Sequence, residues 1–419
     1  MSVLISEAKI LDPQSTFHRK KANILIKDGN ISYIGNRKQK ADVTIEAKGA
    51  VLSPGWFDLS ACFGDPGYEH KEDLSSGREV AMAGGFTEVA VLPNTSPPIQ
   101  SKNDVEYIRR HNKSSLVQLW PVAAISKDLK GEDFTEIIDL KEAGAVAFSD
   151  GLKPIWHTDL LRKCMMYVQK FDGLIIDRPE EKWLSQFGVM NEGVNSALVG
   201  MKGVPSVGEE IAITRDLKIL EYTGGKLHLS NISTAESVKL IRRAKKKGLN
   251  VTCDVAAHQL IYTDDEVNKF DAVYKVSPPL RTEKDIRALI KGLADGTIDA
   301  ITSAHQPQDE ENKKLEYDLA ADGMNNMQVI LPLLNLIKNE IPIEKLIGKL
   351  TTGPREILGM NNPKIEKGEM ANLTLYHAGM KWTFNGDSNQ SKSENSPLFG
   401  QEVTGKVLAV FNNGFHKEV

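Results

Sequence analysis

The chain has 419 residues, of which 41% are hydrophobic and 26% charged, and its formal net charge is −4. A balance this close to neutral gives no electrostatic case for a nucleic acid or an anionic membrane as partner, and no run approaches the roughly 18 apolar residues that cross a bilayer. The cysteines Cys62, Cys164 and Cys253 lie far apart without a CxxC pair. We therefore expect a cytoplasmic protein without disulfides.

The two ends of the chain have the same character. Residues 22–27 alternate in polarity and are followed by the turn 28–30 and a second short run, 31–34, which is typical of a β-hairpin. The last fifty residues again contain strand-like runs separated by a polar stretch. We expect residues 1–53 and 366–419 to form one β-sandwich domain built from both termini.

The middle of the chain, residues 54–365, alternates between strand and helix patterns. One predicted helix covers residues 234–247, with Gly248 as its C-cap. The candidate strands cover residues 50–61, 86–98, 115–125, 143–151, 173–181, 226–234, 249–259 and 298–308. Eight strands, each followed by a crossover, are typical of a (β/α)8 barrel of the TIM type, although a doubly wound α/β sheet would give a similar pattern.

Polar residues gather where these strands end, and in a barrel the strand ends form the rim that carries the active site. The candidates, in chain order, are Asp58, Ser60 and Cys62, then Asn94, Asp150, Asp177, His228, Asn231, His258 and His305. We expect the three histidines to hold the strand ends by hydrogen bonds. We also expect Asp150 and Asp177 to contact an arginine, a lysine or backbone donors, because an unpaired buried carboxylate is costly.

A series of motifs resembles one family from end to end. They are DPGYEHKED (65–73), AGGFT (83–87), LPNTSPP (92–98), AGAVAFSD (143–150), VMNEG (189–193), STAESVKL (233–240), YKVSPPLR (274–281), LADGTIDAI (293–301) and SKSENSP (391–397). Their number and order resemble the dihydroorotases of the amidohydrolase superfamily. The resemblance implies an α/β fold in which a barrel lies beside a β-sandwich. It also implies zinc-dependent, reversible cyclisation of N-carbamoyl-aspartate to dihydroorotate.

The positions where this family keeps its metal ligands and catalytic residue are altered. The His-x-His pair of the first strand is replaced by Ser60 and Cys62, and the histidines of the fifth and sixth strands by Asp177 and Asn231. Asp150 follows Ser149 where the family has a carboxylate ligand, and Ala304 stands in place of the catalytic aspartate. The resemblance thus predicts no catalytic residue, and a degenerate shell with zinc absent or weakly bound.

The substrate positions are altered as well. Asn94 and Arg281 remain, whereas Gly64 replaces the arginine that grips a substrate carboxylate and Ser277 replaces an asparagine. In the loop after the last strand, Ala321 and Asp322 stand where the family has proline and phenylalanine.

These substitutions predict a pseudo-dihydroorotase. The resemblance to the family further implies a homodimer with a structural role in pyrimidine biosynthesis, in association with aspartate transcarbamoylase. An active dihydroorotase or another cyclic-amide hydrolase is the alternative, with Cys62, Asp150 and Asp177 converging on one remodelled metal site or with Cys62 as a nucleophile. A third reading is a small-molecule sensor that uses the old pocket without turnover.

Overall fold

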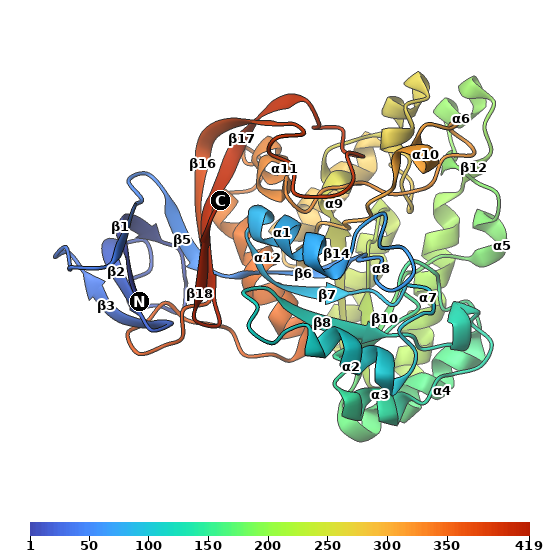
Figure 1. Ribbon diagram of the computed structural model, residues 1–419. Coiled ribbons are helices and arrows are strands. Elements are labelled where there is room, and N and C mark those ends of the chain that lie inside the picture. The colour runs from blue at the N-terminus through green and yellow to red at the C-terminus, as the bar shows by residue number, and fades with distance from the viewer.

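The computed structural model describes all residues, 1–419. Figure 1 shows strands from both chain ends on the left and a barrel surrounded by helices on the right. The predicted arrangement, a barrel flanked by a β-domain that both termini build, is confirmed. None of the helices combines the length and the apolar character that crossing a membrane requires.

The barrel consists of parallel strands in the order β6-β7-β8-β9-β10-β13-β14-β15. A pairing between Ala61 and His305 brings the two edge strands together, which decides for the barrel and against a doubly wound sheet. The strands are β6 (Trp56–Ala61), β7 (Phe86–Val91), β8 (Gln118–Ala123), β9 (Ala147–Phe148), β10 (Leu174–Asp177), β13 (Lys226–Leu229), β14 (Val251–Ala256) and β15 (Ala300–Thr302).

Side chains alternate between the inside of the barrel and the surrounding helices. On β10, Leu174 and Ile176 belong to the inner apolar cluster, whereas Ile175 packs in the layer beneath the helices, as the two-residue period of a strand requires. The covering helices are α1 (Leu74–Gly84), α2 (Lys102–Arg110), α3 (Ile137–Ala143), α4 (Thr158–Val168), α7 (Ser206–Thr223), α8 (Ala235–Lys246), α9 (Glu283–Ala294), α11 (Ile330–Leu336) and α12 (Ile343–Leu358).

Helix α8 illustrates how the sequence sets the helix ends. The Thr234 hydroxyl oxygen accepts a hydrogen bond from the backbone N–H of Ser237, 3.1 Å away, which satisfies one of the free donors of the first turn. At the other end Gly248 has φ +82°, a left-handed conformation that glycine adopts without strain. The helix predicted over residues 234–247 is therefore confirmed.

The two termini build a second sheet in the order β3-β2-β1-β5-β16-β17-β18, with β4 paired to β1. Its residues Ile5, Ile24 and Leu375 belong to an apolar core separate from the barrel. The predicted hairpin is β2–β3. The strands are β1 (Ser2–Ile10), β2 (Lys21–Lys27), β3 (Asn30–Gly35), β4 (Val43–Glu46), β5 (Val51–Pro54), β16 (Leu373–Phe384), β17 (Gln401–Asn412) and β18 (Phe415–Glu418).

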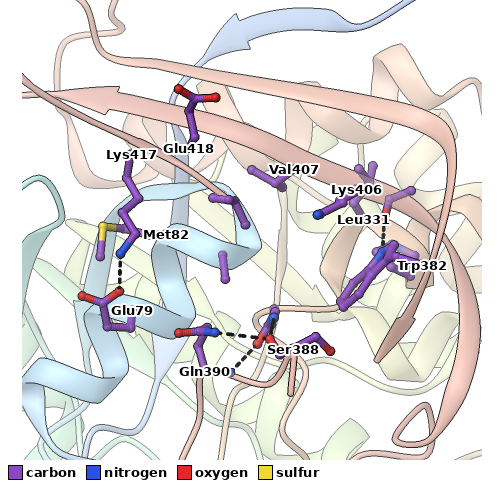
Figure 2. A pocket seen from close by; sticks show the side chains of 15 residues that line it. Glu79, Met82, Leu331, Trp382, Ser388, Gln390, Lys406, Val407, Lys417 and Glu418 are labelled. Carbon is purple, nitrogen blue, oxygen red and sulfur yellow. Dashed lines mark hydrogen bonds and ion pairs between the residues drawn. The ribbon is translucent and has the colours of Figure 1, made fainter. Parts of the chain in front are cut away.

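The long β16–β17 hairpin lies against α1 and α11 and leaves a hollow of about 300 Å³ (Figure 2). Its polar groups largely satisfy one another: Lys417 pairs with Glu79 at 3.3 Å, and the Trp382 indole N–H donates to the Gly405 carbonyl at 2.7 Å. No strand-end residue of the barrel lines this hollow. The hollow therefore lies apart from the predicted site residues.

The longest excursion from the barrel lies between β10 and α7. It contains α5 (Lys182–Ser185), β11 (Met190–Asn191), α6 (Val194–Val199) and β12 (Gly203–Val204), and Figure 1 shows it at the end of the barrel away from the terminal sheet. The short helix α10 (Glu310–Lys313) belongs to the loop after β15.

Candidate functional site

A polar cavity of about 400 Å³ opens at the barrel mouth, where the loops after β6, β7, β8, β9 and β15 meet. Its lining includes two sequence-predicted positions from the first strand, Cys62 and Gly64, and Asn94 from the second. The remaining lining residues are Tyr68, Lys71, Thr95, Ser96, Pro98, Asp128, Leu129, Leu152, Lys153, Gln306, Pro307 and Gln308. This is the place in the fold where an active site is expected.

The end of the first strand is held by hydrogen bonds to the eighth. The buried carboxylate of Asp58 accepts bonds from the Ser303 hydroxyl and from the Ser303 backbone N–H, the latter at 3.2 Å. Burial raises the pKa of Asp58 to about 6, although these bonds oppose the rise. Ser60 is buried beside them, and its backbone N–H donates to Asp58 at 3.3 Å.

Cys62 lines the cavity as a neutral thiol. Its backbone N–H donates to the His305 carbonyl at 2.8 Å, and burial raises the pKa of the thiol to about 12, against the opposing charges of Arg178 and Lys71. The thiolate is the form that attacks carbon or binds a metal. No histidine accepts the Cys62 proton in a hydrogen bond, so this geometry lacks the base that a nucleophilic cysteine needs.

Gly64 occupies a position that admits no side chain. A Cβ at residue 64 would lie 2.4 Å from the Tyr68 carbonyl oxygen, and the backbone N–H of Gly64 donates to the Glu72 carbonyl at 2.8 Å. The loop has closed over the space where the family's substrate-gripping arginine would begin. An arginine at this position would displace the turn at Tyr68.

The loop after β8 donates hydrogen bonds to the carboxylate of Asp150. This carboxylate accepts hydrogen bonds from the Ser126 backbone N–H at 3.0 Å and from the Ser126 hydroxyl at 2.5 Å. Burial raises its pKa to about 6, and the bonds to Ser126 oppose the rise. Asn94 ties the same loop in place, since it donates to the Asp150 carbonyl at 3.2 Å and accepts from the Leu152 N–H at 2.9 Å.

Asp177 turns away from the cavity toward α7. It accepts from the Ile155 backbone N–H at 2.8 Å and lies 3.3 Å from the Arg215 guanidinium, which also pairs with Asp216 at 2.7 Å. Burial raises the pKa of Asp177 well above its usual value, and the neighbouring Asp216 raises it further. The expected contacts of Asp150 and Asp177 with backbone donors or an arginine are confirmed.

The sixth and eighth strands end in unusual backbone conformations. Asn231 has φ +55° and Ala304 has φ +47°, the left-handed region that costs a residue with a Cβ about 1–2 kcal/mol. Asn231 is fixed by its N–H, which donates to Asp254 at 2.6 Å, and by its amide oxygen, which accepts from the Thr302 hydroxyl at 3.2 Å. The Ala304 methyl group offers no proton acceptor.

The three histidines differ in their surroundings. His228 contacts Asp254 and Thr252, each at 2.8 Å, and His258 contacts Asn326 at 3.0 Å, so for these two the predicted structural bonds are confirmed. For His305 the prediction is wrong: neither ring nitrogen has a hydrogen-bond partner, and Nε2 is 3.5 Å from the buried Glu72 carboxylate. Its backbone carbonyl closes the barrel instead.

Two of the predicted substrate positions lie outside the cavity lining. The Ser277 hydroxyl accepts a hydrogen bond from Arg178. Arg281 is buried and donates to Asn191 at 2.8 Å and to the Ser233 hydroxyl at 3.0 Å. Both side chains join loops to one another behind the cavity wall. Of the retained substrate positions only Asn94 faces the cavity, and its amide is already bonded to the neighbouring loop.

A metal ion does not fit the residues present at the strand ends. Zinc sites need three or four nitrogen, sulfur or carboxylate ligands around one point, and no group of three or more His, Cys, Asp or Glu side chains lies close enough to hold a metal. Cys62, Asp150 and Asp177 do not converge, because the two carboxylates are bonded to the serine and the arginine described above.

Comparisons with known proteins agree with the motifs. A family model described as dihydro-orotase-like matches residues 49–237. Over 418 residues the chain is 39% identical to the dihydroorotase of Acetivibrio thermocellus, with 98% of each chain covered. The chain belongs to the dihydroorotase family. The dihydroorotase of Syntrophotalea carbinolica is 37% identical over 99% of this chain and 98% of its own length.

Among solved structures, the L-hydantoinase (dihydropyrimidinase) from Arthrobacter aurescens superposes with a TM-score of 0.85 at 22% identity. The match covers 99% of this chain and 95% of that one. At this identity the likeness shows the shared fold alone.

One residue at this dihydroorotase-like mouth escaped the sequence reasoning. Arg178 follows Asp177 and lies within the electrostatic reach of Cys62 and His258. The signal was available: Leu174 and Ile176 face the barrel interior, and the two-residue period of the strand places residue 178 on the same side. The resemblance assigns a role to the family's histidine position, here Asp177, and none to its neighbour.

Proposed function

We propose that this member of the dihydroorotase family is non-catalytic and serves as a structural partner in pyrimidine biosynthesis, associated with aspartate transcarbamoylase. The observation that carries the proposal is the absence, at the strand ends, of any three metal-binding side chains close enough to share an ion. Bound zinc lowers the pKa of water from about 15.7 to about 7. At about 1.36 kcal/mol per unit this supplies about 12 kcal/mol, which the hydrogen-bonded carboxylates and the neutral thiol described above do not replace.

A second candidate is an active dihydroorotase with a rebuilt mechanism. It is favoured by two relatives named dihydroorotase, which are 39% and 37% identical to this chain over 98% of their own length. Such a mechanism would still need a base at the eighth strand, where Ala304 offers none. The geometry of the mouth therefore favours the non-catalytic function.

The deciding experiment is dihydroorotate hydrolysis by the purified protein, with and without added zinc, beside the Acetivibrio thermocellus dihydroorotase as a positive control. We expect no turnover above the rate in buffer and no zinc retained after gel filtration, measured by elemental analysis. Turnover within a few-fold of the control would refute the proposal. It would make the strand-end residues the first to mutate.

The partner is tested separately. We expect the protein to co-purify with aspartate transcarbamoylase from its native host, and the transcarbamoylase to lose thermal stability when this protein is absent. The homodimer is tested by light scattering on the isolated protein. If the protein neither co-purifies with the transcarbamoylase nor affects its stability, the proposed structural role is refuted. The non-catalytic function would then be decided by the hydrolysis assay alone.

A further inference from the structure

A groove of about 540 Å³ lies on the outside of the barrel, where α3 and the loop before it meet α4 (Figure 1). Its surface is mostly apolar, and it shares no lining residue with the cavity at the barrel mouth. The lining residues are Phe134, Ile137, Arg162, Lys163, Cys164, Met166, Tyr167 and Lys170. The groove is therefore separate from the candidate site described above.

Large apolar side chains are exposed along this groove. Phe134 is 45% exposed and Met166 is 51% exposed, and the ring centres of Phe134 and Tyr167 lie 6.2 Å apart. These side chains form one apolar strip, and removing such a surface from water is favourable. Methionine also adapts its shape to whatever packs against it. The strip therefore suits the apolar part of a ligand.

The charges around the groove are all positive. Its lining contains three cations and no acid. Two of them, Arg162 and Lys163, share the carboxylate of Asp159 at 2.6 and 2.7 Å. Lys170 pairs with no carboxylate, and its Nζ lies 5.0 Å from the centre of the Tyr167 ring. The apolar strip thus ends at an ammonium group that lacks a counter-charge, which complements a ligand with one anionic end.

The size of the groove favours a small molecule over a protein. A stable protein interface takes about 20–30 residues from each partner, whereas eight residues line this groove. Its volume of about 540 Å³ lies within the range of ordinary small-molecule sites, which are mostly apolar with a few polar groups that fix the orientation of the ligand. The groove has this composition.

We propose that the groove between α3 and α4 binds a medium-chain alkyl carboxylate. The alkyl chain lies against Phe134, Met166 and Tyr167, and the carboxylate pairs with Lys170. The inference goes beyond the proposed structural role, since a scaffold needs no ligand and the groove takes no part in dihydroorotate chemistry. A ligand that binds only the folded protein stabilises it, so occupancy joins α3 to α4 and makes the stability of the barrel depend on the ligand concentration.

The test is calorimetric titration of the full-length protein with hexanoate, octanoate and decanoate, below the concentrations at which they form micelles. We expect one saturable site whose affinity rises about two- to fourfold with each added methylene group, the upper value corresponding to complete burial of the methylene. Octanamide, the matched uncharged ligand, should bind about two- to fivefold more weakly than octanoate, because an exposed charge pair contributes a factor of this size.

Variants at two exposed positions test the predicted orientation of the ligand. Lys170→Gln should weaken octanoate binding about two- to fivefold and leave octanamide binding unchanged. Met166→Glu should weaken octanoate binding about tenfold, because it removes part of the apolar strip and adds a like charge, whereas Met166→Leu should bind as the wild type does. The control Lys153→Gln, whose lysine lines the cavity at the barrel mouth, should leave the affinity unchanged.

Four outcomes would overturn the inference. Decanoate may show no saturable binding, or octanoate may bind no more tightly than octanamide. An affinity that Met166→Glu leaves unchanged would place the ligand outside the groove, and an affinity that Lys153→Gln weakens would place it at the barrel mouth. None of these outcomes bears on the non-catalytic function, because the hydrolysis assay involves no residue of the groove.

Discussion

Replacement of Arg215 by methionine tests whether Asp177 is a structural carboxylate or a remnant metal ligand. In the wild type the guanidinium lies 3.3 Å from Asp177 and 2.7 Å from Asp216, and both carboxylates are fully buried. Arg215→Met leaves two adjacent buried acids without their cation. Breaking a buried pair in this way costs about 3–5 kcal/mol.

We expect the lower end of that range, about 3 kcal/mol, because one of the two carboxyl groups can hold a proton. For a chain of this size about 2 °C is lost per kcal/mol, so the melting temperature should fall by about 6 °C at pH 8. The matched control is Arg110→Met, whose guanidinium pairs with Glu106 at 2.7 Å but is 72% exposed. An exposed pair of this kind contributes about 0.3–0.5 kcal/mol.

The loss of stability in Arg215→Met should depend on pH in a defined direction. Burial raises the pKa of both Asp177 and Asp216 in the folded protein, and loss of the arginine raises the pKa of each further. A raised folded-state pKa stabilises the fold at low pH and loses this contribution as the pH rises. The deficit of Arg215→Met should therefore shrink from pH 8 toward pH 5, and adding Asp177→Asn should recover most of it at pH 8.

Two results would refute this reasoning. One is a melting temperature for Arg215→Met no lower than that of Arg110→Met at pH 8, or a deficit that grows on acidification. The other is a zinc-dependent rise in the melting temperature of the wild type that Asp177→Asn abolishes. The latter would show that the carboxylate turns from α7 to a metal when one is supplied.

Three further outcomes are expected in thermal melts of single variants. Burial raises the pKa of Asp58 from 3.8 to about 6, so the wild type should lose about 3 kcal/mol of unfolding free energy as the pH rises from 4 to 6. Asp58→Asn should lack this pH dependence, and identical pH profiles for the two proteins would contradict the prediction. Gly64→Arg should cost about 1–3 kcal/mol through overpacking, whereas Gly386→Arg, with nothing within 4 Å of its Cβ, should be neutral. Ser391→Ala should cost about 1–3 kcal/mol because the buried Glu72 loses a 2.5 Å hydrogen bond; an unchanged melting temperature would show that water replaces the hydroxyl.

The fold was predictable because its signals are local and repeated. Periodicity and terminating residues are visible within each element, as in the strand that ends at Asp177 and the helix that begins after Thr234. Many such strands and helices in alternation indicate one architecture. The end of the fourth strand was harder to place, since only Ala147 and Phe148 pair, against nine residues in the predicted run. Pairing length depends on the neighbouring strands, which a local pattern does not report.

The site was predictable as a set of positions but not as a set of contacts. The strand ends located Cys62 and Asn94 at the mouth, because strand ends share one rim. The direction of Asp177 depends on Arg215, which lies on α7, beyond the long excursion after β10. No local pattern links Asp177 to Arg215, and the same holds for Asp150 and Ser126.

The retained motifs and the altered positions do different physical work. Within SKSENSP, Ser391 bonds to Glu72 at 2.5 Å, and Asn395 donates to the carbonyls of Gln306 and Gly323 at 3.2 and 3.0 Å. These bonds join the loop after the first strand to the loop after the eighth, and they need no metal. The motif therefore serves the architecture.

Close to the altered positions, three pairs of polar side chains join neighbouring strand ends at the barrel mouth: Asp58 with Ser303, Asp150 with Ser126, and His228 with Asp254. Each bond satisfies a buried polar group that would otherwise carry a desolvation cost. These bonds hold strand ends of the barrel in place without a metal, as the proposed structural role requires. His305 is the exception at the mouth, because neither of its ring nitrogens has a hydrogen-bond partner.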